Sequence, residues 1–559
     1  MQGGVTVTIS SADTKQPLKK GMKTATRILI LTVIILMQLA VLVKVGFDKK
    51  EYHIDEIYSY LLSNSYDADR ISNDDSKWDQ WVSGSEFYEF ITVQDGEQFS
   101  YDKVFYNNSL DAHPPLFYCI IHTICSLFPG QFSKWIGLIL NMLIMVGLDI
   151  LLYKISRKII SSEVMQFLPV FVYSLSPVAI ETASFIRMYM LLTFFSAAFC
   201  YCTICMLKDG VSIKRLIPTW LIIYLGAMTH YYALVICFWG VLLFEIYLIK
   251  KKDIKHMLIN GAGSLVAVAM VYVTYPSILT QAFGSSTNGV GKDISGSFFD
   301  VRFHLRQIRY LVLELIEGFA YRNWGYIVCA VIALIMIALL VYAAAKNGKS
   351  AFKMSKESIW VLCVFFLTFL TVGYVGGHYV SLRYTYLVLP LIYVFVGCFI
   401  DRYTRDVKAV FRNGIICLVA AYTLGICFYG TWFKMSPYLF LDTAESDEIL
   451  SDYSDCRLIV ICTGHYKETA VPTGNFMKIM NFNDVYLTTK SSLEQNNVFA
   501  QCLAEDEQFV VYIGTDEYWL EEDNLDPYET ISELSGDQSF TYTEITDGTL
   551  GQFYLIKKN

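Results

Sequence analysis

Charged residues are scarce in this chain. Only 17% of its 559 residues are Asp, Glu, Lys or Arg, against roughly 25% in an ordinary soluble protein, and the mean hydropathy is +0.41. This shortage excludes a set of soluble globular domains. Few Pro or Gly tracts interrupt the chain and 15% of it is aromatic, which excludes intrinsic disorder because there is ample surface to bury.

The chain also lacks a basic excess. Its 44 Lys and Arg residues stand against 52 Asp and Glu residues, for a formal net charge of -8. Nucleic acid is therefore excluded as the main partner, because neutralising phosphates requires a basic face. The 14 cysteines show no zinc-ligand spacing and do not indicate a disulfide scaffold.

Long apolar runs are abundant. Crossing a bilayer takes about 20 apolar residues, and the sequence predicts about eleven such spans within residues 25–435. We expect them at 25–46, 133–153, 164–181, 188–207, 216–229, 231–249, 257–277, 326–345, 358–377, 384–400 and 413–433.

The distribution of Lys and Arg predicts the orientation. Basic clusters follow alternate spans, as in the short cytoplasmic loops of membrane proteins. The pattern is consistent only if the apolar stretch 115–129 does not span, so we expect a surface helix there. Residues 1–24 are then a cytoplasmic tail, and the C-terminus lies outside the cell membrane.

Two large polar pieces fall on the outer side. The first outer loop covers residues 47–133, and residues 436–559 follow the last span. Short β-rich runs alternate with polar stretches in the second piece, which predicts a small extracytoplasmic α/β domain. Its expected strands are Arg457–Cys462, Phe509–Ile513, Phe540–Ile545 and Gln552–Ile556.

The first outer loop carries two chemically suggestive motifs. Asp55 and Glu56 directly follow the first span, where an apolar surface can raise the pKa of a carboxylic acid and let it act as a base. A solvated loop start is the ordinary alternative. Near the other end, Pro114 and Pro115 fix an extended chain that aims His113 back towards the loop; a structural cap is its alternative.

Further ionisable and aromatic residues lie at expected outer ends of spans. Glu181, Arg187 and Tyr189 belong to one short turn, where either ligand binding or an ion pair between Glu181 and Arg187 is expected. His230 occupies a similar position, with aromatic neighbours that are also typical of the interfacial belt. Arg383 has a guanidinium suited to bidentate contact with phosphate.

One outer loop carries unexpected bases. Residues 303–319 predict an amphipathic surface helix whose arginines meet either a lipid headgroup of pyrophosphate type or anionic lipids in general. The bases of this loop are Lys292, Arg302, Arg306, Arg309 and Arg322.

Together these motifs resemble the GT-C membrane glycosyltransferases. The pairing of Asp55-Glu56 with His113-Pro114-Pro115 is most similar to the bacterial relatives of protein O-mannosyltransferases and aminoarabinose transferases, glycosyltransferase family 39 in the broad sense. The resemblance covers roughly residues 25–435. It implies a mainly α polytopic fold with about eleven transmembrane helices, followed by the small α/β domain.

The resemblance also implies a reaction. A sugar would pass from a polyprenyl-phosphate donor to an acceptor hydroxyl of a glycan, lipid or protein. The transfer would take place at the outer face of the cell membrane, with inversion at the anomeric carbon. Asp55 would be the general base and Glu56 its support. The expected substrate-binding residues are His113, Glu181, Arg187, Tyr189, His230 and Arg383.

Some points stay open from the sequence. Some relatives use a divalent metal, and His53, Asp55 and His113 are the candidate ligands, but their spacing is not diagnostic and no metal site is assigned. A flippase or transporter of a lipid-linked glycan is one alternative function. A polymerase or ligase of surface polysaccharide is another. No internal repeat of the transporter kind is visible, which favours an enzyme.

Overall fold

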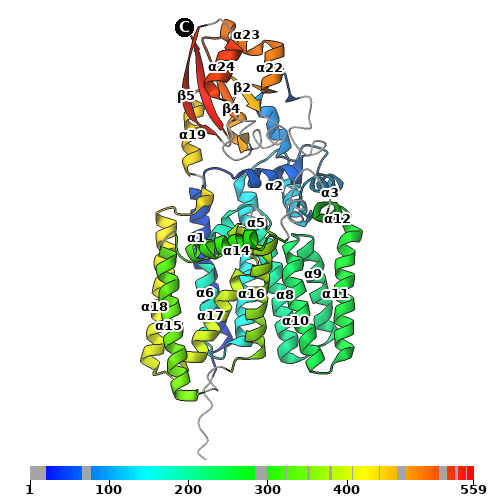
Figure 1. The fold of residues 1–559 in the computed structure, drawn as a ribbon, viewed down its shortest axis with the longest axis vertical. Helices are drawn as coiled ribbons and strands as arrows, with labels where there is room; N and C mark the ends of the chain where they lie inside the picture. The colour runs from blue at the N-terminus through cyan, green and yellow to red at the C-terminus, as the bar shows by residue number, and fades with distance from the viewer. Residues whose placement is uncertain are drawn as a thin grey trace, which may run out of the picture.

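Long helices form a bundle at one end of the molecule, and a sheet domain lies at the other (Figure 1). The computed structural model describes residues 21–65, 77–283, 299–321, 324–348, 353–376, 381–405, 407–439, 441–462, 474–514, 526–535, 539–548 and 551–559.

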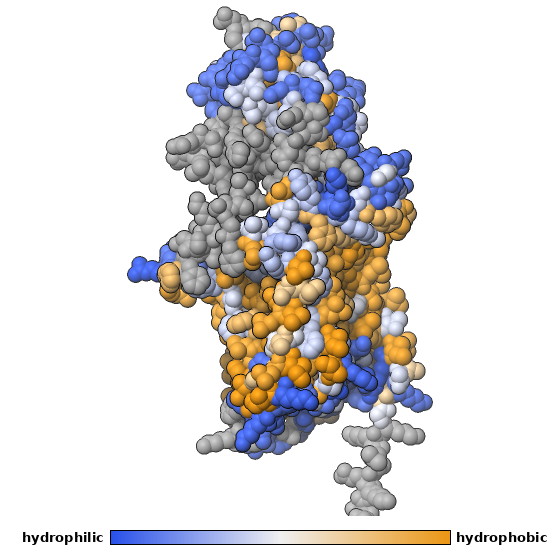
Figure 2. Space-filling model, turned by 90° about the vertical axis from the view of Figure 1, so that its right-hand side faces the viewer, coloured by the Kyte–Doolittle hydropathy of each residue, from blue (hydrophilic) through white to orange (hydrophobic). Residues whose placement is uncertain are grey.

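Within these residues, eight helices are long and apolar enough to cross a membrane. They are α1 Thr24–Asp48, α5 Lys134–Ile159, α8 Tyr189–Asp209, α10 Tyr232–Lys250, α11 Ile254–Thr274, α15 Trp324–Asn347, α16 Lys356–Val375 and α18 Ala409–Trp432. Figure 2 shows an apolar belt between polar ends on one face of the molecule, as expected for a multi-pass membrane protein.

Three further predicted spans have helical counterparts of a different form. Helices α6 Leu168–Ser174 and α7 Pro177–Ser184, after η4 Met165–Phe167, make a pair bent by 52°, and this pair raises the count of candidate spans in the described residues to nine. Helices α9 Ile213–Ala227 and α17 Leu389–Thr404 are shorter than the eight long helices. All eleven predicted segments are therefore helical, while the number that cross the membrane stays a prediction.

In the part that the structure describes, the first outer loop contains four short helices. They are α2 Ile54–Asn64, η3 Gly84–Phe90, α3 Tyr101–Ser109 and α4 Leu116–Ser126. Helix α4 lies in the stretch predicted not to span, and its 11 residues reach only about 16 Å. Its residues Phe117, Tyr118 and Ile121 are fully buried, so α4 packs within the protein and does not merely lie on the membrane surface.

The C-terminal domain contains a six-stranded mixed sheet with the order β1-β3-β2-β4-β6-β5. The four predicted strands are present, and β1 and β3 were not predicted from the sequence. The strands are β1 Trp81–Val82, β2 Arg457–Cys462, β3 Asp484–Thr489, β4 Gln508–Gly514, β5 Phe540–Gly548 and β6 Gly551–Lys558.

Both faces of the central strand β2 are buried. Ile459 and Ile461 point into the apolar layer formed with α22 Lys490–Asn496, α23 Val498–Glu505 and α24 Pro527–Ser535. Leu458 and Val460 point into the opposite layer. A strand covered on two faces reads as a continuous apolar run, which explains why β2 is recognisable from the sequence.

Strand β1 joins the first outer loop to the C-terminal domain. It pairs antiparallel with β3, with Trp81 opposite Tyr486. Just beyond it, the backbone of Gly84 packs so closely that an added Cβ would lie 2.4 Å from the Ile479 carbonyl oxygen and 2.5 Å from that of Phe482. The loop and the domain thus share one packed interface.

Helix α14 Val301–Gly318 lies across the ends of the long helices on the side of the C-terminal domain (Figure 1). Its first turn is capped by Asp300, whose carboxylate accepts a hydrogen bond from the Phe303 amide at 3.0 Å. The predicted amphipathic helix over 303–319 is therefore present. Lys292 and Arg322 of the same predicted basic loop lie outside the described residues.

Substitution of Gly84 tests the loop interface. We expect Gly84→Ala to lower stability by about 1–3 kcal/mol, the usual cost of overpacking, because backbone atoms and not flexible side chains would meet the new methyl group. Thermal unfolding of the purified protein measures the change. Gly261→Ala is the matched control, since no atom lies within 4 Å of its added Cβ; an equal effect of the two substitutions would contradict the interpretation.

Candidate active site

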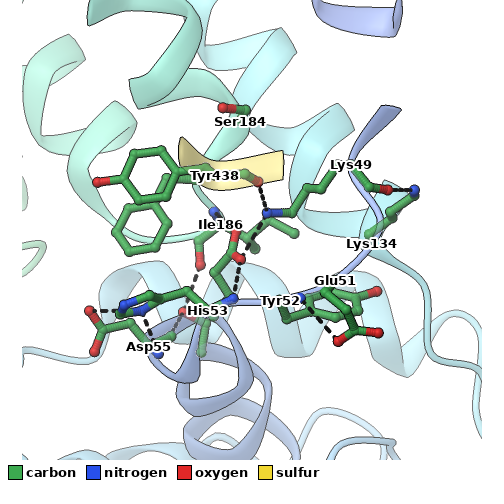
Figure 3. Close-up of polar contacts among 12 residues, drawn as sticks. Lys49, Glu51, Tyr52, His53, Asp55, Lys134, Ser184, Ile186 and Tyr438 are labelled. Carbon is green, nitrogen blue, oxygen red and sulfur yellow. Dashed lines mark hydrogen bonds and ion pairs between the residues drawn. The ribbon is translucent and has the colours of Figure 1, made fainter. Parts of the chain in front are cut away.

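The start of helix α2 organises the candidate site. His53 caps the helix. Its Nδ1 accepts a hydrogen bond from the Asp55 amide at 3.0 Å, and the Glu56 carboxylate accepts one from the His53 amide at 2.8 Å. This reciprocal capping box satisfies amides that a helix N-terminus leaves free. Figure 3 shows His53 and Asp55 beside each other at this end of the helix. The cap fixes where the Asp55 side chain emerges.

Glu56 is completely buried behind Asp55. Its Oε2 lies 2.9 Å from the Lys49 ammonium, which is equally buried, and its Oε1 accepts a hydrogen bond from the Ile186 amide at 2.7 Å. Lys49 also donates to the Tyr438 carbonyl oxygen at 2.7 Å (Figure 3). Glu56 therefore joins the start of α2 directly to the turn at Ile186 and, through Lys49, to Tyr438. This position fits the supporting role expected of it.

Asp55 lies between two arginines that are far away in sequence. Arg383 Nη1 donates to Asp55 Oδ2 at 2.7 Å, and Arg187 Nη2 lies 3.7 Å from Oδ1. The three predicted residues thus converge at one place. The alternative ion pair between Arg187 and Glu181 is not formed, because the Glu181 carboxylate instead accepts a hydrogen bond from the Tyr386 hydroxyl at 3.5 Å.

The direction of the pKa shift of Asp55 differs from the sequence expectation. Burial by itself raises the pKa of this carboxyl group, but the charges of Arg187 and Arg383 outweigh it and hold the pKa below its ordinary value. The expectation of a raised pKa is therefore wrong for the protein without substrate. Its error was to weigh the apolar surroundings without the two cations.

Arg187 is held rigidly. It is buried, and its Nη1 donates to the Tyr118 hydroxyl of α4 at 3.0 Å. The turn before it is fixed by Asn141 of α5, whose side-chain amide donates to the carbonyl oxygens of Ala183 at 3.2 Å and Phe185 at 2.9 Å. The preceding bend between α6 and α7 brings this turn beside α2.

Arg383 lies on η7 Leu382–Thr385. Helix α14 supports this turn, since Glu314 accepts a hydrogen bond from the Leu382 amide at 2.7 Å. Arg383 also lines an open cavity of about 690 Å³ next to the site. Other residues lining this cavity are Glu181, Glu314, Glu317, Tyr386, Lys434 and Tyr438. Arg383 therefore connects the Asp55 carboxylate to a space large enough for a small ligand.

The remaining predicted residues form an aromatic and imidazole cluster beside Asp55. The His113 and His230 rings are 5.6 Å apart, and the Tyr189 ring is 5.9 Å from that of His230. His113 is oriented by Asp111, at 2.8 Å from Nδ1. Burial lowers the pKa of His230, and the charges of His113 and Arg187 lower it further, which favours a neutral imidazole.

Four supporting residues were not identified from the sequence. Lys49, Tyr118, Asn141 and Tyr438 contact the site or its supports through the bonds described above. Lys49 looks like an ordinary interfacial lysine after a span. Tyr118 follows the His113-Pro114-Pro115 motif but has no signal of its own, and Asn141 and Tyr438 have no motif around them. Only the fold brings them together.

The candidate metal ligands do not fit a divalent cation. In the described part of the chain, no group of three or more His, Cys, Asp or Glu side chains is placed to hold a metal ion. Of the three candidates, Asp55 already faces two guanidinium groups, and His53 turns its Nδ1 to the Asp55 amide. A divalent cation at Asp55 would meet two positive charges at close range.

The buried ion pair of Glu56 gives a stability prediction. We expect Glu56→Gln to destabilise the protein by about 3–5 kcal/mol, because Lys49 is left as an uncompensated buried charge. Glu86→Gln is the control: Glu86 pairs with Lys77 at 2.8 Å but its side chain is 49% exposed, so a loss under about 1 kcal/mol is expected. Thermal unfolding followed by circular dichroism compares the two, and equal losses would refute a structural role for Glu56.

Comparison with solved structures identifies the fold. No family model matches the chain, and no curated protein matches it in sequence. The structure is similar to that of ArnT from Cupriavidus metallidurans bound to undecaprenyl phosphate, with a TM-score of 0.52 and 10% identity over 95% of this chain and 98% of that one. It is also similar to the Archaeoglobus fulgidus oligosaccharyltransferase in its apo form, with a TM-score of 0.50 and 10% identity over 95% of this chain and 74% of that one. The chain therefore has the GT-C fold of these membrane proteins.

Proposed function

We propose that this protein is a membrane glycosyltransferase that moves a sugar from a polyprenyl-phosphate donor to an acceptor hydroxyl at the outer face of the cell membrane. One observation carries the proposal: the Asp55 carboxylate lies within 2.7 Å of Arg383 and 3.7 Å of Arg187, beside an open cavity at one end of the apolar helices. A base for a hydroxyl and cations for a phosphate are the two things this transfer needs.

The reaction follows from these groups. Asp55 takes the proton of the acceptor hydroxyl, and the acceptor oxygen forms a bond to the anomeric carbon of the sugar. The bond from that carbon to the phosphate oxygen breaks, and the polyprenyl phosphate leaves with the electron pair. Attack from the side opposite the phosphate inverts the configuration. Arg383, which lines the cavity, and Arg187 stabilise the departing negative charge.

The two arginines also link donor binding to the strength of the base. In the free protein their charges lower the pKa of Asp55, which makes its carboxylate a weak base. A bound phosphate would offset the same charges, so the pKa of Asp55 would rise as the donor arrives. Asp55 then gains basicity only when a donor is present, which disfavours proton abstraction without transfer.

An apolar cavity supports a lipid donor. It measures about 290 Å³ and is lined by side chains of α6, α15, α17 and α18. Two of its lining residues, Ser176 and Phe319, are the chain neighbours of Pro177 and Gly318, which line the cavity at Arg383. A headgroup in the polar cavity would thus have an apolar space nearby for part of its chain.

Replacement of Asp55 tests the base. In proteoliposomes supplied with polyprenyl-phosphate sugars, Asp55→Asn is expected to lower the transfer rate by about 10²–10⁴-fold, the usual contribution of a positioned base. Asp209→Asn, which changes an ion-paired acid at the far end of α8, should keep the rate. Full activity of Asp55→Asn would contradict the assignment. Lipid-linked sugar moving across the bilayer without transfer would favour a flippase, and transfer of whole glycans only would favour a polymerase or ligase.

The pH profile tests the role of the arginines. Arg383→Gln removes one of the charges that lower the pKa of Asp55, so this pKa rises and the acid limb of kcat/KM should move to higher pH. Wild-type protein should show its limb at lower pH, because a depressed pKa keeps the carboxylate ionised further into acid. Arg405→Gln is the control, since Arg405 pairs with Asp401 at the opposite end of the bundle. An acid limb that stays in place in Arg383→Gln would contradict the coupling.

A further inference from the structure

Helix α14 presents two faces with different roles. One face packs on the outer end of α16: the His304 ring stacks on Tyr374 with centroids 3.8 Å apart, and Ile308 and Leu311 lie against Gly373, where an added Cβ would approach them to 3.0 and 3.1 Å. Gly373 is two residues from the end of α16. This contact fixes α14 across the ends of the spans.

The outward face carries three arginines. Arg302, Arg306 and Arg309 are exposed, and their spacing of four and three residues places them along one side of the helix. None of the three has a hydrogen bond or ion pair with any residue that the structure describes. The helix therefore offers a row of unpaired positive charges.

An apolar stripe runs beside this row. Val301, Leu305 and Val312 are 59%, 61% and 40% exposed, and at about 100° per residue they occupy the arc between the packed face and the arginines. A helix with apolar residues on one arc and Arg on the next is typical of segments that lie in the membrane interface, with the apolar arc in the acyl region and the cations at the phosphates.

The arginines do not belong to the candidate active site. Helix α14 lines the cavity at Arg383 only through Glu314, Glu317 and Gly318, which belong to its last turns. The arginines occupy the first half of the helix, whereas the cavity-lining residues of the last turns include two acids. A donor phosphate in the cavity is therefore not their partner.

We propose that α14 docks on anionic phospholipid headgroups of the outer leaflet through Arg302, Arg306 and Arg309. The proposal does not depend on the reaction catalysed. Docking would hold the helix in the interface plane, and Glu314 would pass this restraint to the turn that carries Arg383 through its bond to the Leu382 amide.

Hydrogen exchange in nanodiscs tests the docking. Full-length protein is placed in phosphatidylcholine alone or with added phosphatidylglycerol, and amide exchange is followed for peptides of α14. We expect exchange to be at least about three-fold slower with phosphatidylglycerol, because polybasic segments bind anionic lipid surfaces. The triple variant Arg302→Gln/Arg306→Gln/Arg309→Gln should lose this difference, and the corresponding triple Lys variant should keep it.

Two controls make the outcome specific. Lys250→Gln/Lys251→Gln/Lys255→Gln removes exposed bases at the opposite end of the bundle and should leave the α14 response unchanged. Exchange of α16 peptides reports whether a variant is folded. Equal α14 exchange in the two lipids for wild-type protein would overturn the proposal, as would a Gln variant that retains the full response. Neither readout uses transfer activity, so failure here is separate from failure of the glycosyltransferase proposal.

Discussion

The buried carboxylate of Glu56 is the constraint on which the candidate site depends. It accepts from the start of α2, from the Lys49 ammonium and from the Ile186 amide. These contacts place Asp55 beside Arg187, 3.7 Å from its Nη2. Through Lys49 they also include the carbonyl of Tyr438. An ion pair with no solvent exposure is costly to form, and the hydrogen bonds around this one offset that cost.

The segment after the last long helix also packs against this ion pair and its neighbours. Lys50 donates its amide to the Leu439 carbonyl oxygen at 2.9 Å, and the Tyr438 ring stacks on Phe185 at 4.4 Å. The segment that leads from the last span into the C-terminal domain therefore packs against the turn that precedes Arg187. The helical bundle, the first outer loop and the segment that leads into the C-terminal domain therefore contact one another at the site.

The sequence predicted the helices and the converging charges well, for a physical reason. Apolar runs such as that of α1 have few alternatives to a helix in a bilayer, because every backbone polar group must be satisfied internally. Arg187 stood out because an ionisable residue in a short turn between two spans is costly at that depth, and Asp55 and Arg383 stood out because a carboxylate suits a base and a guanidinium suits a phosphate. Asp55 was assigned the wrong direction of pKa shift, because the arginines that cause it come from positions 132 and 328 residues away.

The missed features depend on distant contacts. Strand β1 has only two residues, which is too short for any periodicity, and it exists because β3 accepts it as an edge partner. Lys49 looks in the sequence like any lysine beside a membrane, and its structural role becomes visible through its bonds to Glu56 and Tyr438. Such residues require the fold to be known first.

The pairing of β1 with β3 also sets an order of assembly. Trp81 and Tyr486 are partners, so the first outer loop is synthesised about 400 residues before the strand that completes it, or roughly 20–80 s earlier at 5–20 residues per second. During that interval the loop can rest only on the membrane helices already made. Strand β3 therefore completes the packing of this loop, which reaches its final structure only when the C-terminal domain folds.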